Sequence, residues 1–140
     1  MRALILYSST GKLDELVKGL ESGLRSVGYD VQLMEAAAAL STPAVSAGRY
    51  DLICVGSPAE GLFGGSIAAD VNAAIKHFSR LQGRPCAAFV KARLIGSSRS
   101  LRTLMEAMES QGAWVQDFAA VGTPADAYRL GRRLQSVQQL

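Results

Sequence analysis

The sequence predicts an α/β protein in which one five-stranded parallel sheet lies between two layers of helices. Continuous apolar runs of strand length alternate with segments of helical periodicity, and this order of strand then helix occurs five times. Strands that alternate with helices pair in parallel, and right-handed crossovers place the helices on both faces of the sheet. Because 140 residues is close to the usual size of one domain, we expect a single domain over residues 1–140.

The first half of the chain contains two strand and helix pairs. Residues 3–7 form a continuous apolar run, as expected of a strand that is buried on both faces. In residues 13–28 apolar positions recur every three and four residues, which predicts an amphipathic helix. Alternation over residues 29–34 predicts a partly exposed edge strand. Residues 35–50 are rich in Ala and Ser and predict a short helix with Pro43 in its first turn.

The second half of the chain repeats the pattern three times. Its predicted strands are residues 52–55, 85–90 and 113–121, and its predicted helices are residues 67–80, 99–111 and 124–138. Glycine and proline mark the connections. The third strand opens at Gly56 into a glycine-rich loop, Gly112 ends a helix, and Pro124 lies in the first turn of the last helix.

The composition is that of an ordinary globular chain, with 49% hydrophobic and 19% charged residues. The apolar runs are far shorter than the roughly 20 residues of a membrane helix. The first residues do not form an export signal, so we expect a cytoplasmic protein. Cys54 and Cys86 lie in apolar strand segments and are expected to be free core thiols. A single histidine, His77, argues against a metal centre or a catalytic triad, and we expect neither catalytic nor metal-binding residues.

The charge is distributed unevenly, although the net charge is only +3. Between Asp70 and Glu106 there is no acidic residue but seven basic ones: Lys76, Arg80, Arg84, Lys91, Arg93, Arg99 and Arg102. This stretch either attracts an anionic ligand or an acidic partner, or consists of dispersed solvated charges. It contains neither a recognition motif nor interleaved aromatic residues, so we do not expect nucleic-acid binding.

In an open parallel sheet, ligands bind beyond the carboxyl ends of the strands. Three predicted loops therefore form the candidate site, at residues 8–13, 57–66 and 91–98. Ser8, Ser9, Thr10 and Gly11 bring hydroxyl and backbone N–H groups to the start of a helix, an arrangement suited to a phosphate. The alternative is that Ser9 or Thr10 only caps the helix.

The first of these loops resembles the phosphate loop of flavodoxins, Ser/Thr-x-Thr-Gly-x-Thr. Ser8, Thr10 and Gly11 match the motif, whereas Leu13 replaces its last hydroxyl residue. Residues 50–58 look like the third strand of flavodoxin-family proteins and the turn after it, and Gly83-Arg84-Pro85 is also similar. The resemblance implies the strand order 2-1-3-4-5, with FMN at the carboxyl ends of strands 1, 3 and 4 and electron transfer to a redox partner protein.

The resemblance also implies which residues contact FMN. The phosphate side would be formed by Ser8, Ser9, Thr10, Gly11, Lys12 and Leu13, and the ring side by Ser57, Pro58, Ala59, Glu60, Gly61 and Phe63. Lys12 would add a cation near the phosphate, Glu60 would accept a hydrogen bond from a ring N–H, and Phe63 would stack on the ring or cover the sheet. The flavin would carry out the redox chemistry itself.

Two other functions are compatible with the same residues. A flavodoxin-like protein that has lost FMN would use the crevice or the basic surface for another anion or a protein partner. Leu13 and the scarcity of aromatic residues in the two ring loops favour this alternative. A flavin-dependent reductase would bind a substrate in the crevice. The sequence decides neither between these functions nor the oligomeric state.

Overall fold

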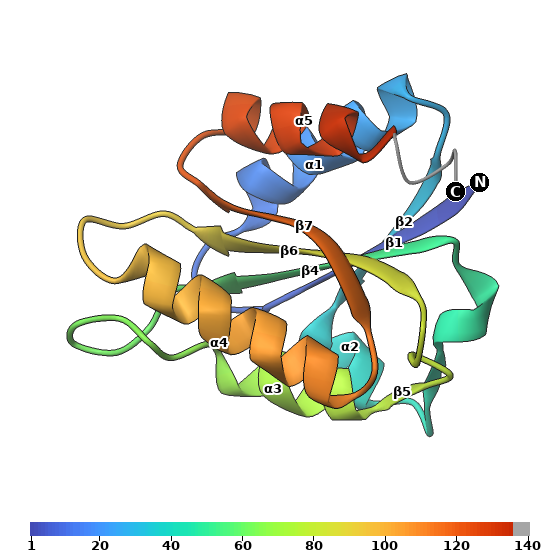
Figure 1. The fold of residues 1–140 in the computed structure, drawn as a ribbon, viewed down its shortest axis with the longest axis horizontal. Coiled ribbons are helices and arrows are strands. Elements are labelled where there is room, and N and C mark those ends of the chain that lie inside the picture. The colour runs from blue at the N-terminus through green and yellow to red at the C-terminus, as the bar shows by residue number, and fades with distance from the viewer. Residues whose placement is uncertain (136–140) are drawn as a thin grey trace.

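The computed structural model describes residues 1–135 and contains, within them, a five-stranded parallel sheet (Figure 1). The strands of this sheet are β1 (Arg2–Tyr7), β2 (Asp30–Glu35), β4 (Leu52–Pro58), β6 (Pro85–Lys91) and β7 (Trp114–Val121). They lie in the order β2-β1-β4-β6-β7. Numbered among the five strands alone, this is 2-1-3-4-5, so the predicted order and the predicted parallel pairing are confirmed.

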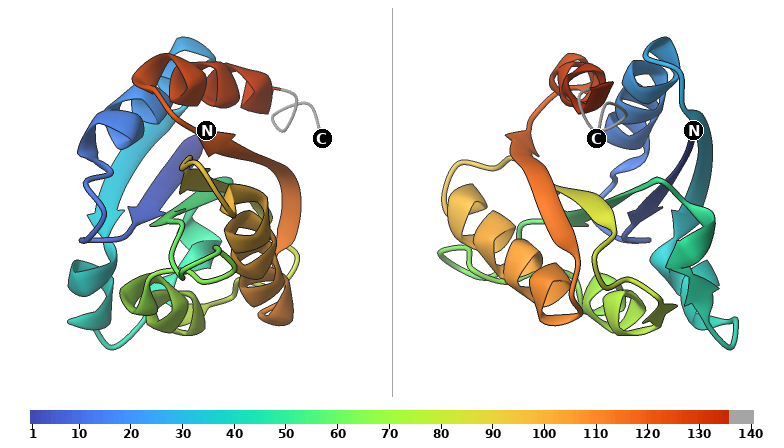
Figure 2. Two further views of the ribbon diagram at one scale, coloured as in Figure 1. Left: turned by 90° about the vertical axis from the view of Figure 1, so that its left-hand side faces the viewer. Right: turned by 45° about the vertical axis from the view of Figure 1, so that its right-hand side comes forward.

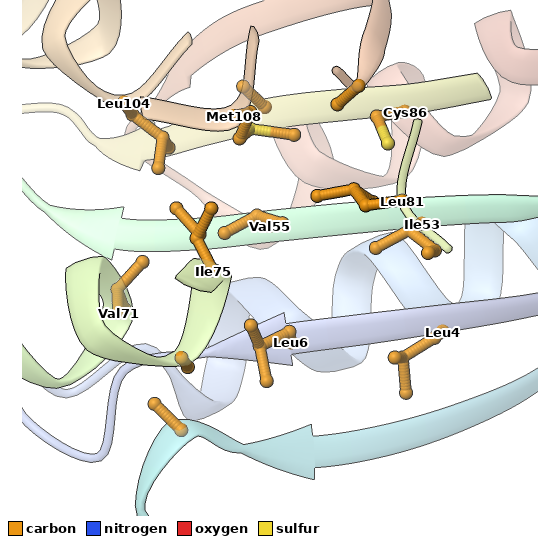
Figure 3. Close-up of a cluster of buried hydrophobic side chains, with 14 of the residues drawn as sticks. Leu4, Leu6, Ile53, Val55, Val71, Ile75, Leu81, Cys86, Leu104 and Met108 are labelled. Carbon is orange, nitrogen blue, oxygen red and sulfur yellow. The ribbon is translucent and has the colours of Figure 1, made fainter. Parts of the chain in front are cut away.

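Helices cover both faces of the sheet, which gives three layers (Figure 2). One face carries α1 (Asp14–Ser26) and α5 (Pro124–Arg133), and the other carries α2 (Ala36–Leu40), α3 (Ala69–Lys76) and α4 (Ser97–Ser110). Side chains of β1 alternate between the two cores, since Leu4 and Leu6 face α2–α4 while Ala3 and Ile5 face α1 and α5. Figure 3 shows the first of these cores, where Leu104 and Met108 of α4 lie over the sheet.

The third sheet strand is longer than predicted. It was expected to end at Val55, but β4 continues to Pro58 because residues 56–58 pair with residues 89–91 of β6. Gly56 is therefore part of the strand and not of a turn. The carboxyl edge of the sheet starts at Pro58, three residues later than predicted.

Two predicted helices are also shorter in the structure. The helix expected at residues 67–80 is α3, which ends at Lys76 because Phe78–Ser79 forms a short strand, β5. This strand pairs with β3 (Val45–Ser46) in a small second sheet that the sequence did not predict. The helix expected around Pro43 is α2, which ends at Leu40, so Pro43 lies beyond the helix and not in its first turn. A 3₁₀ turn at Ala47–Arg49 completes this connection.

The remaining elements lie close to their predicted positions. The helix expected at residues 99–111 begins two residues earlier, at Ser97. The last helix begins at Pro124 as predicted and ends at Arg133, and the end predicted at Gln138 lies outside the described residues. Among the helices of residues 1–135, none combines the length and the hydrophobicity needed to cross a bilayer.

Small residues bring α1 and α5 into backbone contact. A Cβ atom added at Gly23 of α1 would lie 2.3 Å from the carbonyl oxygen of Tyr128 in α5. At Gly19 it would lie 2.3 Å from the carbonyl oxygen of Pro124. Because backbone atoms cannot move aside as a flexible side chain can, these two positions set the spacing between the helices.

We predict that Gly23→Ala destabilises the protein, although alanine is the better helix former. The clash with Tyr128 should cost about 1–3 kcal/mol and outweigh the roughly 1 kcal/mol gained in helix propensity. Urea unfolding followed by circular dichroism measures the change in the free energy of unfolding. Ser22→Ala, at the exposed neighbouring position of the same helix, is the matched control and should not be destabilising. Equal stability of Gly23→Ala and the wild type would show that the helices can move apart at little cost.

Both thiols are fully buried, as expected of core cysteines, and both are free. Burial raises the pKa of Cys86 to about 12 and also raises the pKa of Cys54 strongly. Since the thiolate is the reactive form, we predict that the native protein resists alkylation by N-ethylmaleimide at pH 8, whereas both cysteines are modified in denaturant. Mass spectrometry of timed samples measures the modification. Rapid labelling without denaturant would mean that one of the two cores opens readily.

Candidate functional site

The carboxyl ends of β1, β4 and β6 lie at the same edge of the sheet, because the three strands are parallel neighbours. Three connections leave this edge: the β1 loop (residues 8–13), the β4 loop (residues 59–68) and the β6 loop (residues 92–96). These correspond to the three loops that the sequence predicted as a candidate site. The structure therefore brings the predicted site residues to one edge, although it gives them different environments.

The β1 loop makes a tight left-handed turn against the end of β4. Gly11 has φ +80° and Lys12 has φ +55°. A Cβ atom at Gly11 would lie 2.6 Å from Cβ of Pro58, so only glycine fits here. Leu13 faces inward and is 2% exposed, within the core under α1. The residue that replaces the last hydroxyl of the phosphate motif is thus a core residue.

The alternative interpretation of Ser9 and Thr10 as helix caps is wrong. Helix α1 begins at Asp14 with Leu13 in the N-cap position, and no side chain caps it. Ser9 and Thr10 are exposed in the loop ahead of the helix. Their polar groups are therefore not used by the helix end.

An acidic side chain occupies hydrogen-bond donors of the β1 loop. Asp70, in the first turn of α3, accepts a hydrogen bond from Ser8 Oγ at 2.8 Å and another from the backbone N–H of Ser9 at 2.9 Å. Ser8 Oγ in turn accepts a hydrogen bond from the N–H of Thr10 at 3.0 Å and shares one with Thr10 Oγ1 at 2.9 Å. The loop thus binds an anion, and that anion is a carboxylate of the protein itself.

A lysine lies on the other side of the same loop. Lys91, the last residue of β6, donates from Nζ to the carbonyl oxygen of Gly11 at 3.2 Å and is 3.5 Å from that of Lys12. Lys12 itself is exposed. The loop therefore keeps two cations near its turn, while its donors on the α3 side are used by Asp70.

Four of the residues expected to contact a flavin ring, Ser57 to Glu60, have structural roles at the end of β4. Ser57 is fully buried, accepts a hydrogen bond from the N–H of Ala68 at 2.9 Å and donates one to the carbonyl oxygen of Pro58 at 2.8 Å. Pro58 and Ala59 are also buried. Glu60 is half-buried and its backbone pairs with Ser66 across the base of the β4 loop. These residues hold the end of β4 and the start of α3 in place.

Arg93 ties the β6 loop to the β4 loop. Its Nε donates to the carbonyl oxygen of Ile95 at 2.7 Å and its Nη1 to that of Ala59 at 3.3 Å, and its Nη2 contacts that of Gly61. Gly61, which the flavodoxin resemblance implied on the ring side of the site, thus has its carbonyl group bonded to a guanidinium.

The two loops also touch directly. A Cβ atom at Gly64 would lie 2.3 Å from the carbonyl oxygen of Gly96, so the two backbones are in contact. From α4, Ser100 Oγ accepts a hydrogen bond from the N–H of Gly65 at 3.0 Å, and Thr103 Oγ1 donates to its carbonyl oxygen at 2.8 Å. The backbone carbonyl group of Phe63 also lies against Gly96, while the residue is 63% exposed. The β4 and β6 loops are therefore closed onto each other.

Two residues that determine the character of this site, Asp70 and Arg93, were not among the predicted site residues. Asp70 was only the last acidic residue before the basic stretch, and Arg93 only one of its seven cations. No local signal marks either side chain, because the hydrogen bonds that tie them to other loops join distant residues. Asp70 bonds the β1 loop 61 or more positions away, and Arg93 bonds the β4 loop 32 or more positions away. Within the part of the chain that the structure describes, His, Cys, Asp and Glu form no group of three or more suited to a metal ion.

The similarity of this chain to known proteins is visible in its structure alone. No protein-family profile and no curated protein sequence matches the chain. A flavodoxin from the domain Archaea superimposes with a TM-score of 0.71 at 20% identity, covering 99% of both chains. Two-electron reduced flavodoxin from Megasphaera elsdenii gives a TM-score of 0.75 at 20% identity, covering 97% of this chain and 99% of the other.

A larger protein contains the same fold as one part. The flavodiiron core from Synechocystis gives a TM-score of 0.72 at 15% identity, and the match covers 99% of this chain but 36% of that one. At such low identities the similarity concerns the course of the backbone and not the residues of the site. Together with the strand order and the two helical layers, it shows that this chain has a flavodoxin-like fold.

Proposed function

We propose that this protein works without resident FMN and that the carboxyl edge of its sheet binds a protein partner. The observation that carries the proposal is the carboxylate of Asp70 on the donors of the β1 loop. The residues present at this edge do not fit the phosphate and the ring of FMN, for reasons of charge and of space.

The charge of Asp70 opposes a phosphate at the β1 loop. Two unit charges 4 Å apart repel each other by about 4 kcal/mol at an effective dielectric constant of 20. This corresponds to a loss of nearly a thousandfold in affinity. Movement of Asp70 away from the loop would relieve the repulsion, but it would break the hydrogen bonds to Ser8 and Ser9. Either way, binding of a phosphate has a cost that an open loop would not impose.

The closed β4 and β6 loops oppose a flavin ring between them. A ring between these loops would need the Arg93 hydrogen bonds to break and the backbones at Gly64 and Gly96 to separate. The β6 loop contains no aromatic residue, and Phe63 is the only one in the β4 loop. Stacking on aromatic side chains would therefore contribute little binding free energy to offset the cost of opening the loops.

Electron transfer with FMN is the second candidate, and the shape of the β1 loop favours it. Ser8, Thr10 and Gly11 keep the phosphate motif, and the turn at Gly11 and Lys12 is left-handed. Lys91 adds a cation beside the loop. The solved flavodoxins whose backbone this chain matches support the same candidate at the level of the fold.

A titration of the purified protein with FMN, followed by flavin fluorescence, distinguishes the two candidates. We predict no phosphate-dependent binding up to about 100 μM FMN, that is, an affinity weaker than roughly 5 kcal/mol. Riboflavin, which has the same ring and no phosphate, is the control ligand. Binding of FMN at low micromolar concentration, with much weaker binding of riboflavin, would overturn the flavin-free proposal in favour of the electron carrier.

Replacement of Asp70 tests its part in excluding phosphate. We predict that Asp70→Ala binds FMN at least about tenfold more tightly than the wild type, because it removes a negative charge and frees the donors of Ser8 and Ser9. Glu109→Ala, at an exposed acidic residue in the last turn of α4 and far from the β1 loop, is the matched control for net charge and should bind FMN as the wild type does. An equal gain in both variants would show that only overall charge matters.

A further inference from the structure

The tips of the β4 and β6 loops expose four large apolar side chains in one place. Leu62 is 86% exposed and Leu94 is 99% exposed, and Phe63 and Ile95 beside them are more than half exposed. The other exposed large hydrophobic residues among those described are less exposed, and Leu33 and Leu40 belong to β2 and α2, away from these loops. Adjoining exposed apolar side chains of this size on a folded chain mark an interaction site.

The hydrogen bonds that close the crevice also hold these side chains in place. Arg93 joins the two loops, Gly64 contacts Gly96, and α4 anchors Gly65 through Ser100 and Thr103. Figure 1 shows both loops projecting beyond the same edge of the sheet. A partner therefore meets apolar side chains on loops that are already ordered, which lowers the entropic cost of binding.

A hollow begins at the first turn of α4, where Ser98 follows Ile95 of the β6 loop by three residues. It has a volume of about 280 Å³ and is lined by Ser98, Leu101, Arg102, Met105 and Phe118. Its walls are mostly apolar, and it is large enough to take an apolar side chain of a partner. Buried anchors of this kind supply most of the affinity in protein interfaces.

The charge around these side chains is predominantly positive, although Glu60, the one acidic residue of the β4 and β6 loops, lies two positions before Leu62. Arg99 lies exposed in the first turn of α4, Arg102 forms part of the hollow, and no acidic residue occurs from residue 71 to residue 105. The Arg93 guanidinium adds a positive charge beneath the tips while it bonds backbone carbonyl groups. A partner that covers the tips must complement this charge.

We propose that the four loop-tip residues, together with Arg99 and the α4 hollow, form a docking surface for an acidic segment of another protein that carries apolar side chains. This inference rests on the proposed role of the carboxyl edge in binding a partner, and it specifies the surface and the chemistry of that partner. The apolar side chains of the segment contact the tips and fill the hollow, while its carboxylates face Arg99 and Arg102.

The distribution of charge favours an acidic protein segment over two other occupants, an anionic membrane and a second copy of this chain. Electrostatic attachment to an anionic membrane uses clusters of four to eight Lys and Arg, whereas three exposed arginines, Arg93, Arg99 and Arg102, lie beside these tips, and the Arg93 guanidinium already bonds backbone carbonyl groups. A symmetric contact between two copies would bring Arg99 of each copy towards the basic surface of the other, which is repulsive. An acidic protein segment satisfies both the apolar and the charged groups.

Selection from a display library of random peptides tests the proposal without a known partner. The library is selected on the wild-type protein and counter-selected on Leu62→Ser/Leu94→Ser. We expect the enriched peptides to combine acidic and apolar residues. Enrichment of basic or uncharged peptides, or failure to find any peptide that distinguishes the two proteins, would overturn the proposal.

The most enriched peptide is then labelled and titrated, with binding followed by fluorescence anisotropy. We expect Leu62→Ser/Leu94→Ser to weaken its binding at least about tenfold and Arg99→Glu to weaken it about three- to tenfold, with less effect at high salt. Leu33→Ser/Leu40→Ser, which changes two exposed leucines away from the loops, is the matched control and should bind as the wild type does. Equal weakening in the control would overturn the proposed location.

Two further measurements test the other occupants. Sedimentation that shows a dimer dissociated by Leu62→Ser/Leu94→Ser would identify a second copy as the occupant. Flotation with phosphatidylserine vesicles that depends on the same leucines would identify a membrane. Either result would overturn the proposed docking surface. Neither would change the conclusion on FMN, because the affinity for FMN is measured in a separate titration.

Discussion

The burial of the sheet on both faces is the constraint from which the rest of the structure follows. Side chains of the central strands alternate between the core under α1 and α5 and the core under α2–α4, and neither core is open to solvent at β1, β4 or β6. Only the ends of these strands remain available to a ligand or a partner. Binding must therefore involve the loops at the carboxyl edge, whose backbone is not already used by the sheet.

Ser8 Oγ, the buried donor of the β1 loop, needs an acceptor whether or not a ligand binds. A buried donor without a partner costs about 1–3 kcal/mol, so this position is destabilising when no acceptor occupies it. Here Asp70 provides the acceptor for Ser8 Oγ and the N–H of Ser9. This internal ion makes the loop stable without a cofactor, and the same contact makes a second anion unfavourable. In the function that we propose, the stability of the loop and the exclusion of phosphate are two effects of one side chain.

Arg93 has a similar double effect at the neighbouring loops. Its guanidinium satisfies carbonyl groups of both the β4 and the β6 loop, which closes the space where a flat ring would lie. With the loops closed, Leu62 and Leu94 at the tips are almost fully exposed. In the function that we propose, this edge therefore offers a protein partner an ordered apolar surface with positive charge beside it, in place of a crevice for a small planar ligand.

The order of elements, the parallel pairing and the position of the β1 loop could be predicted from the sequence because they follow from patterns of apolar, hydroxyl and glycine residues along the chain. Apolar periodicity identified the strands and helices, and Ser8, Thr10 and Gly11 identified the turn. The prediction failed where pairing between distant segments decides the structure. Gly56 and Pro58 have the composition of a turn but are held extended by β6, and α3 ends early because β5 pairs with β3.

The sequence by itself therefore determined the fold and the place of the site, since both follow from which residues are apolar and in what order. Only the tertiary structure decided what the site can accept. Asp70 is 62 positions from Ser8, and Arg93 is 34 positions from Ala59. Contacts over such separations arise when parallel strands bring their loops to one edge, and a pattern read along the chain does not contain them.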